Sequence, residues 1–544
     1  MVAAVSLQAQ LAETIEVRIT NVDVVVTDKA GKPVTGLTKD DFEIVEAGKQ
    51  QPITNFYEIR DAAADAVPAV EGQTAAPASV AEVPQEVTRR RIVVFVDNFT
   101  IHPLSRNQAF EAVEKSLDTL LRPGDEAMIV FWQGTTHDLA PFTADRAALI
   151  SRFRAASKKS GGGMTLEAMR SQIIEHASQM IADANSPARR KITHADAYSI
   201  SLQNSRAFAE NLYSVQNNLM DGLERTLSTL AGVPGKKALI FIGAELADTP
   251  GLELFHQIDG MYQQYIRDIR PAVLRESGRT LGAELRKVAQ RANANGVTMY
   301  LVDAADRSRR SDPTEHMIDP GAAFVSETNT PMAMSTVAAI TGGISVPGGR
   351  NFEKALGTIA RDLSSYYSLG YRSPEGGEGN RRFQVRVKKP GLRVRSRSSY
   401  VARSGEDEIR DRVIANVFHD DVKSDFPIRV DAAAPEATDG GRFKVKLTIT
   451  IPSTLTLIEQ DDQLAGEFAV FFATGRPDGA LSTVSKSVQA MKFPGDAREQ
   501  VEAQKTFNYT ATLLMQPGEQ FVSVGVSDTL AGTAGFGRTK VTAQ

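Results

Sequence analysis

The residue best placed to bind a ligand lies at the end of a buried-strand pattern. A strand at 91–96, apolar from Ile92 onward, leads directly into Asp97, and a helical pattern begins a few residues later. Open α/β sheets bind their ligands at the carboxyl ends of the strands, in the crevice beside a reversal of strand order. The sequence therefore predicts a ligand site at Asp97.

The residue patterns that carry the common kinds of catalysis are missing from the sequence. The seven histidines include no H-E-x-x-H motif, and there is no G-x-S-x-G elbow, P-loop or G-x-G-x-x-G after a strand. The lack of cysteine excludes disulfides, thiolate nucleophiles and zinc knuckles formed by this chain. We therefore predict no catalytic or cofactor-binding residues. An unrecognised enzyme site in the α/β crevice is the remote alternative.

The strand that leads to Asp97 is the first of a series that alternates with helices. Further buried-strand patterns at 127–132, 238–242 and 297–302 are separated by helical stretches, of which the first spans 104–121. This alternation is typical of a doubly wound parallel sheet. We assign residues 89–372 to such an α/β domain.

Two helical segments are longer than a minimal domain of this type needs. The first spans about 165–230 with a break at 185–187, and the second spans about 252–293. A polar stretch that reaches about Thr330 reads as a long loop, and a short helix is expected at 332–341. We treat 165–230 as a helical insertion, whose role the sequence does not indicate.

The regions that flank the α/β domain have strand periodicity. Residues 13–60 and 381–403 each supply only a few short strands, which rarely form a stable sheet alone. We therefore expect the two regions to pair as a composite β-sandwich, with the proline-containing stretch 61–88 as a linker. About seven strands at 405–544 predict an immunoglobulin- or fibronectin-like sandwich.

Charge and hydropathy restrict the partners. The 62 basic and 66 acidic residues leave a formal charge of -4, which provides no overall field to attract nucleic acid. No apolar run reaches the 18 or more residues of a transmembrane anchor. Residues 1–12 are similar to the end of an export signal, which predicts a secreted, periplasmic or cell-surface protein, although a frayed N-terminus would have the same composition.

Taken together, Asp97 and the stretch from Ser365-Tyr366-Tyr367 to Tyr400 resemble a bacterial family related to the von Willebrand factor type A domain and abundant in Acidobacteria. The resemblance covers most of residues 13–400. It implies a doubly wound, Rossmann-like von Willebrand factor A-like domain that follows a β segment, with export signals and altered metal-site loops. Together with the strand patterns, this predicts an α/β domain with flanking immunoglobulin-like sandwiches.

The metal loops of that family are altered in this sequence. The family motif Asp-x-Ser-x-Ser keeps its aspartate as Asp97, but Phe99 and Ile101 replace the serines. Thr165 follows three glycines as in the second loop, where it is either a ligand or a helix N-cap. Gly243-Ala244-Glu245 stands in place of Ser-Asp-Gly. The resemblance thus implies weak or absent Mg²⁺ or Mn²⁺ binding through Asp97, Thr100, Thr165 and Glu245.

We accordingly predict a non-enzymatic protein-binding or adhesion module. In this reading the altered face contacts a protein partner, with Asn98, Phe99 and Asp248 among the contacts. The alternative is a structural subunit of a cell-surface assembly, in which the sandwiches and the helical insertion make the contacts and self-assembly is possible.

Overall fold

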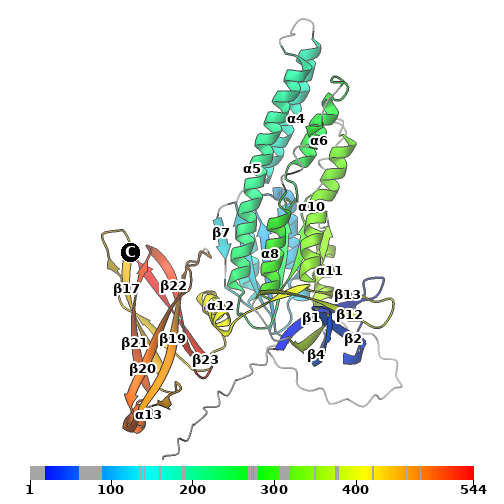
Figure 1. The fold of residues 1–544 in the computed structure, drawn as a ribbon. Helices are drawn as coiled ribbons and strands as arrows, with labels where there is room; N and C mark the ends of the chain where they lie inside the picture. Colours follow the sequence, from blue (N-terminus) through cyan, green and yellow to red (C-terminus); the bar gives the residue numbers. More distant parts are fainter. Residues whose placement is uncertain are drawn as a thin grey trace, which may run out of the picture.

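A computed structural model shows a mixed α/β protein with a parallel sheet flanked by antiparallel sheets (Figure 1). The predicted signal remnant at 1–12 and the linker at 61–88 lie outside the described residues. The structure describes residues 19–60 and 89–544, except 135, 140, 159–160, 187–191, 268–270, 273, 275–277, 279, 306–318, 348, 350, 374–378, 420–421, 461 and 478.

The central sheet has six strands in the order β10-β9-β8-β5-β6-β7. Five are parallel, and β7 pairs antiparallel with β6 as a hairpin. The chain runs outward from β5 in both directions, so the strand order reverses between β5 and β8, which is the doubly wound arrangement. The strands are β5 (Arg90–Asp97), β6 (Glu126–Gln133), β7 (Thr136–Leu139), β8 (Lys236–Gly243), β9 (Val297–Asp303) and β10 (Ser345–Pro347).

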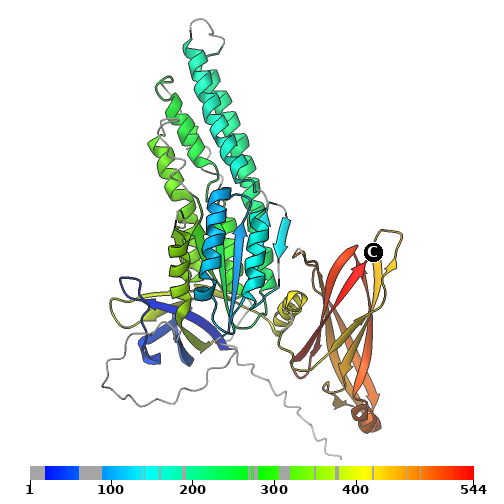
Figure 2. The same ribbon diagram turned by 180° about the vertical axis from the view of Figure 1, so that it is seen from behind.

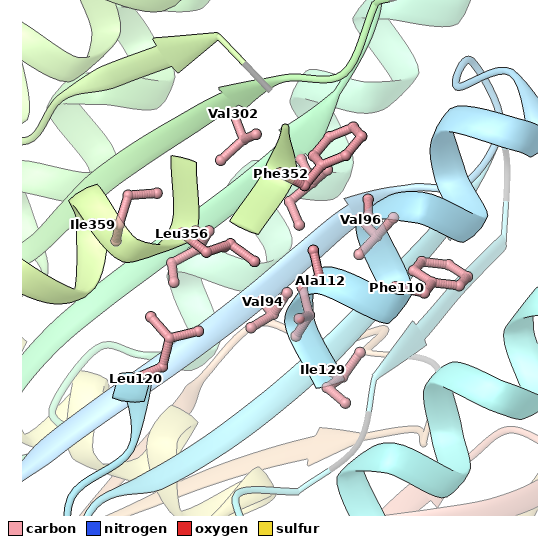
Figure 3. Close-up of a cluster of buried hydrophobic side chains, with 14 of the residues drawn as sticks. Val94, Val96, Phe110, Ala112, Leu120, Ile129, Val302, Phe352, Leu356 and Ile359 are labelled. Carbon is pink, nitrogen blue, oxygen red and sulfur yellow. The ribbon is translucent and has the colours of Figure 1, made fainter. Parts of the chain in front are cut away.

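Helices cover both faces of this sheet, because the buried strands have apolar side chains on both sides. Val94 and Val96 of β5 point to the face covered by α2 (Pro103–Leu120), α3 (Arg146–Ser157) and α11 (Phe352–Ser364). Figure 3 shows these two valines beneath side chains of α2 and α11. The intervening Val93 and Phe95 point to the face covered by α5 (His194–Thr229), α8 (Gly282–Ala294) and α10 (Pro320–Thr341).

Helices also extend far beyond the edge of the sheet, as both views show (Figures 1 and 2). We call α4 (Gly163–Asn185), the first part of α5, α6 (Leu252–Tyr262) and the first part of α10 the helical projection. At 36 residues, α5 alone is about 54 Å long at 1.5 Å per residue. The helical projection has an apolar core of its own, which includes Met180, Leu202 and Phe255, so it is a packed bundle.

Two helix predictions are wrong. Within 252–293 the described residues include α6 and, separately, α8 rather than one continuous helix. The loop expected to reach Thr330 ends at Asp319, because α10 begins at Pro320. The Asp319 carboxylate accepts a hydrogen bond from the Ala322 N–H at 3.0 Å, and proline is favoured at the first helical position. Pro320 and Gly321, which are typical of turns, concealed this helix start.

The N-terminal strands form a sandwich with strands that follow the α/β domain. One sheet has the order β13-β1-β11-β4 and the other β14-β12-β2-β3. Val24, Ile44, Leu369 and Phe383 are among the side chains that fill the space between them. The strands are β1 (Ile19–Thr27), β2 (Phe42–Glu46), β3 (Lys49–Gln51), β4 (Ile53–Arg60), β11 (Ser365–Arg372), β12 (Gly379–Val387), β13 (Arg393–Ser396) and β14 (Ser399–Ala402).

The expected end of the α/β domain at 372 is corrected by this arrangement. Strand β11 lies in the sandwich, between β1 and β4, so the α/β domain ends with α11. All of β11 except its last residue is buried. A strand buried on both faces has the same sequence pattern at the centre of a sandwich as in a parallel sheet, so the pattern alone did not separate the two.

The C-terminal region is a second two-sheet sandwich, preceded by α12 (Gly405–Phe418). Its core lies between β17 and β21 on one side and β19 and β22 on the other. Several strands are 10 to 13 residues long rather than short. The immunoglobulin-like topology stays a prediction. The strands are β15 (Arg429–Ala432), β16 (Glu436–Ala437), β17 (Phe443–Pro452), β18 (Ile458–Gln460), β19 (Gln463–Gly475), β20 (Ser485–Pro494), β21 (Thr506–Met515), β22 (Gly518–Asp528) and β23 (Thr533–Ala543).

Among the described residues, no helix has both the length and the apolar character needed to cross a membrane.

Candidate functional site

A small polar cavity lies at the carboxyl ends of β5 and β8, where the strand order reverses. Its volume is about 30 Å³, which is close to the space that one water molecule occupies in the liquid. The start of α4 closes it from the side of the helical projection. The lining residues are Thr100, His102, Gly163, Leu166, Glu167, Arg170, Ala244, Glu245, Ala304 and Ala305.

Asp97 lies behind this cavity and uses both carboxylate oxygens within its own loop. It is fully buried. Its Oδ1 accepts hydrogen bonds from the N–H groups of Phe99 at 3.1 Å and Thr100 at 2.9 Å, and its Oδ2 accepts one from the Thr100 hydroxyl. The two residues predicted to be ligands in this loop therefore bind each other and stabilise the turn.

Burial raises the pKa of Asp97 to about 7. The hydrogen bonds from Thr100 and Phe99 act in the opposite direction, and the nearby Glu245 carboxylate adds to the increase. A metal ligand must be deprotonated, so this environment disfavours the form of Asp97 that would bind a cation at neutral pH.

The raised pKa predicts how stability depends on pH. Because the folded-state pKa is above the unfolded value, the contribution of Asp97 is fully present below about pH 4 and is lost as pH rises through about 7. Asp97→Asn imitates the protonated side chain without titrating. We expect wild type to lose more than about 1 kcal/mol relative to this variant between pH 4 and pH 8. Urea unfolding of both proteins at several pH values measures the difference, and parallel curves would contradict the prediction.

Asn98 and Phe99 both pack against neighbouring side chains, and only Phe99 keeps partial exposure, so their contact with a partner stays a prediction. Asn98 is fully buried, and its Oδ1 accepts a hydrogen bond from Arg106 at 3.2 Å. The Phe99 ring packs edge-on against Trp132, with 5.8 Å between ring centroids. Ile101 is also fully buried. The apolar replacements in this loop therefore serve packing.

The three glycines before α4 allow the helix to begin directly on the Asp97 loop. A Cβ atom on Gly163 would lie 2.5 Å from the Ile101 carbonyl oxygen, and one on Gly162 would lie 2.7 Å from the Phe99 ring. Separations under about 3 Å are not tolerated without movement of the backbone or ring. The glycine run thus has a steric role in closing the site.

Thr165 is neither a cavity residue nor the helix N-cap. The N-cap of α4 is Gly162, which places Thr165 at the third helical position, where it is exposed. Helix α4 begins at Gly163, two residues before Thr165. Its side chains that face the cavity lie one to five residues after Thr165. Leu166, Glu167 and Arg170 face the cavity instead.

Arg170 is the residue of this site that sequence reasoning missed. It is 8% exposed, and its Nη2 lies 3.4 Å from Glu245 Oε1 and 3.0 Å from Glu253 Oε1. Its guanidinium also lies over the Phe208 ring, 5.3 Å from the centroid. The pair with Glu245 joins positions 75 residues apart, and no motif links them. The only available signal was a basic residue one turn after Leu166 on the inward face of α4.

The two acidic candidates after β8 are placed differently. Glu245 is buried in the cavity wall and pairs with Arg170. Asp248 is half-buried and does not line the cavity, and its carbonyl accepts a hydrogen bond from the Leu281 N–H at 2.7 Å. The loop turns away after Glu245 because Leu246 packs into the core beneath the sheet.

These donors do not fit a divalent cation. Magnesium requires about six oxygen ligands in octahedral geometry. Here the oxygens of Asp97 are engaged by Thr100 and Phe99, and the guanidinium of Arg170 already balances Glu245. Within the described parts of the chain, no three acidic, histidine or cysteine side chains gather in a metal-binding arrangement.

Comparison with known proteins does not assign a family. No family model matches the chain, and no curated protein matches it. The structure is similar to an aerotolerance-related membrane protein from Bacteroides fragilis NCTC 9343, with 11% identity, a TM-score of 0.22, and coverage of 51% of this chain and 98% of the other. BatB from Bacteroides thetaiotaomicron gives 10% identity, a TM-score of 0.21, and coverage of 51% and 97%.

A third similar structure is the pilus adhesin SpaC from Lactobacillus rhamnosus GG, with 10% identity, a TM-score of 0.23, and coverage of 95% of this chain and 62% of the other. TM-scores of this size do not establish a shared fold. The relationship to von Willebrand factor A-like proteins therefore stays a prediction from the sequence.

Proposed function

We propose that this protein is a non-catalytic, protein-binding component of the cell surface or extracellular space, and that its helical projection makes the principal contact. This is close to the second of the two readings that the sequence left open, but it places the contact on α10, which lies outside the predicted insertion at 165–230. The observation that carries it is the apolar outer surface of α10. Location outside the cell rests on the export-like residues 1–12 alone.

The first reading, in which the Asp97 face binds the partner, has less support. Asn98 and Thr100 are buried, and the cavity beside them has room for about one water molecule. A partner could not reach these groups unless the start of α4 moved away. A substrate meets the same obstacle, which argues against an enzyme at this site.

Helix α10 combines little charge with two large exposed apolar side chains. Glu327 is its only charged residue in 22 positions. One face packs against the sheet and α6, yet on the outer side Phe324 is 66% and Met332 is 67% exposed. Exposed apolar surface of this kind marks interaction sites. We therefore expect a protein partner whose contact surface is apolar.

Site-specific photo-crosslinking tests this proposal. A photoreactive residue is placed at Phe324, or at the exposed Thr165 beside the Asp97 face, and each protein is incubated alone and with an envelope extract. We expect a discrete adduct from position 324 that Met332→Asp removes and that Thr336→Asp, a change at an exposed polar position of the same helix, leaves intact. Adducts from Thr165 alone, adducts indifferent to Met332→Asp, or none at all would contradict it.

A further inference from the structure

A second cavity lies at the other end of the central sheet, where the N-terminal sandwich meets the beginnings of β8 and β9. Its volume is about 190 Å³, several times the roughly 30 Å³ that one water molecule occupies. Both domains line it: Lys236 and Lys237 come from β8, Asp23 from β1, Ser368 from β11, and Arg397 from the link between β13 and β14.

The charges in this wall do not balance. Three cationic side chains, those of Lys236, Lys237 and Arg397, line the cavity together with a single carboxylate, that of Asp23. Lys236 Nζ lies 3.9 Å from Asp23 Oδ2, which is beyond hydrogen-bond distance. A neighbouring carboxylate, Asp362, is already paired with Arg395.

The other two cations are held by neutral groups. Lys237 Nζ donates a hydrogen bond to the Val233 carbonyl at 2.8 Å, and Arg397 donates to the carbonyls of Asn293 at 3.0 Å and Asn21 at 2.6 Å. Carbonyl oxygens satisfy the donors, but they leave the net positive charge in place. Buried charges are normally paired, so such a surplus is unusual.

The ammonium of Lys236 is the least satisfied of the three. Its side chain is 3% exposed, and its Nζ lies 3.2 Å from the centroid of the Tyr366 ring. Burial lowers the pKa of Lys236 to about 8 and that of Lys237 to about 7. Desolvation is the main cause of both shifts, and the Asp23 carboxylate offsets it only in part.

We propose that this cavity binds a small oxyanion of the phosphate or sulfate class. Lys236 supplies the principal charge, Lys237 and Arg397 add to the positive field, and the Ser368 hydroxyl at the cavity wall offers a neutral donor. The anion would contact β8 of the α/β domain and β11 of the sandwich together. It would therefore stabilise the junction between the two domains, independently of the protein-binding role proposed above.

Titration of inorganic phosphate and of sulfate into the full chain, followed by calorimetry and thermal unfolding, tests this site. The reference is sodium chloride at matched ionic strength. We expect saturable binding and a rise in melting temperature with both oxyanions, and no saturable effect of chloride. Equal effects of all three salts would overturn the proposal, because they would indicate general screening alone.

Two variants with opposite expected effects locate the binding. Lys236→Met removes a buried charge that only the carboxylate of Asp23, 3.9 Å away, offsets, so it should fold and weaken phosphate binding at least tenfold. Asp23→Asn removes the one carboxylate from the wall, so it should strengthen binding several-fold. Lys287→Met, a change at a lysine with a 65% exposed side chain, is the control and should leave binding unchanged. If Lys236→Met and Asp23→Asn both bind phosphate as wild type does, the cavity is not the site.

Discussion

Replacement of Arg170 by methionine is expected to lower the free energy of unfolding by about 3–5 kcal/mol, the usual cost of removing one partner of a buried ion pair. Arg170 lies between Glu245 and Glu253, and the side chains of all three are at most 16% exposed. Methionine retains much of the apolar volume but leaves two carboxylates without a cation. Urea unfolding followed by the fluorescence of Trp132, the only tryptophan, measures the loss.

The matched control is Arg154→Met. Arg154 also pairs with a glutamate, Glu114 at 3.3 Å, but its side chain is 70% exposed. Exposed pairs contribute about 0–1 kcal/mol, so this variant should unfold almost as wild type does. Similar losses in both variants would mean that the buried ion pairs of Arg170 contribute no more to stability than the exposed pair of Arg154.

Arg170→Met also tests why the site at Asp97 does not fit a metal. The Arg170 guanidinium supplies the positive charge that a bound metal ion would otherwise supply. If this is the reason that no metal fits, Mg²⁺ or Mn²⁺ at millimolar concentration should raise the melting temperature of Arg170→Met and leave that of wild type unchanged. Binding of either ion by wild type that Asp97→Ala abolishes would instead show that the altered loops retain a metal site.

Gly163→Ala is expected to destabilise the protein by about 1–3 kcal/mol or more, the range seen when an atom is forced into a packed interior. The added Cβ would lie 2.5 Å from the Ile101 carbonyl oxygen and 2.7 Å from that of Thr100. Both contacts are with backbone, which cannot rotate away as a side chain would. The start of α4 must therefore lift from the Asp97 loop, and the emission of Trp132, which packs on Phe99, should report the change.

Gly357→Ala is the control for this substitution. Gly357 lies within α11, and a Cβ at this position would meet no atom within 4 Å. Alanine is favoured over glycine in a helix by about 0.5–1 kcal/mol, so this variant should be slightly more stable than wild type. The opposite signs of the two glycine substitutions separate steric closure of the site from general helix propensity. A neutral effect of Gly163→Ala would show that α4 can begin elsewhere.

The spacing of apolar residues along the sequence predicted most of the fold. The continuous apolar runs at 92–96 and 238–242 are short and bounded by turn residues, which is typical of strands buried on both faces, and the helical patterns between them imply the doubly wound order. The long helical segment broken at 185–187 also follows from its spacing, and α4 and α5 lie on either side of that break. The place of the candidate site followed as well, because Asp97 directly succeeds such a strand. These features depend on neighbours in the sequence, so the sequence by itself determined them.

What only the tertiary structure decided is the role of each side chain at that place. Asn98 is a polar residue in a loop, and it is fully buried where α4 begins against this loop through the glycines. Arg170 meets Glu245 from 75 positions away in the sequence. The surplus of positive charge at Lys236 likewise arises where two domains meet. The burial and charge pairing of a side chain depend on all of its neighbours in space. For these residues the decisive neighbours are distant in sequence, so local sequence patterns could not predict the role of each side chain.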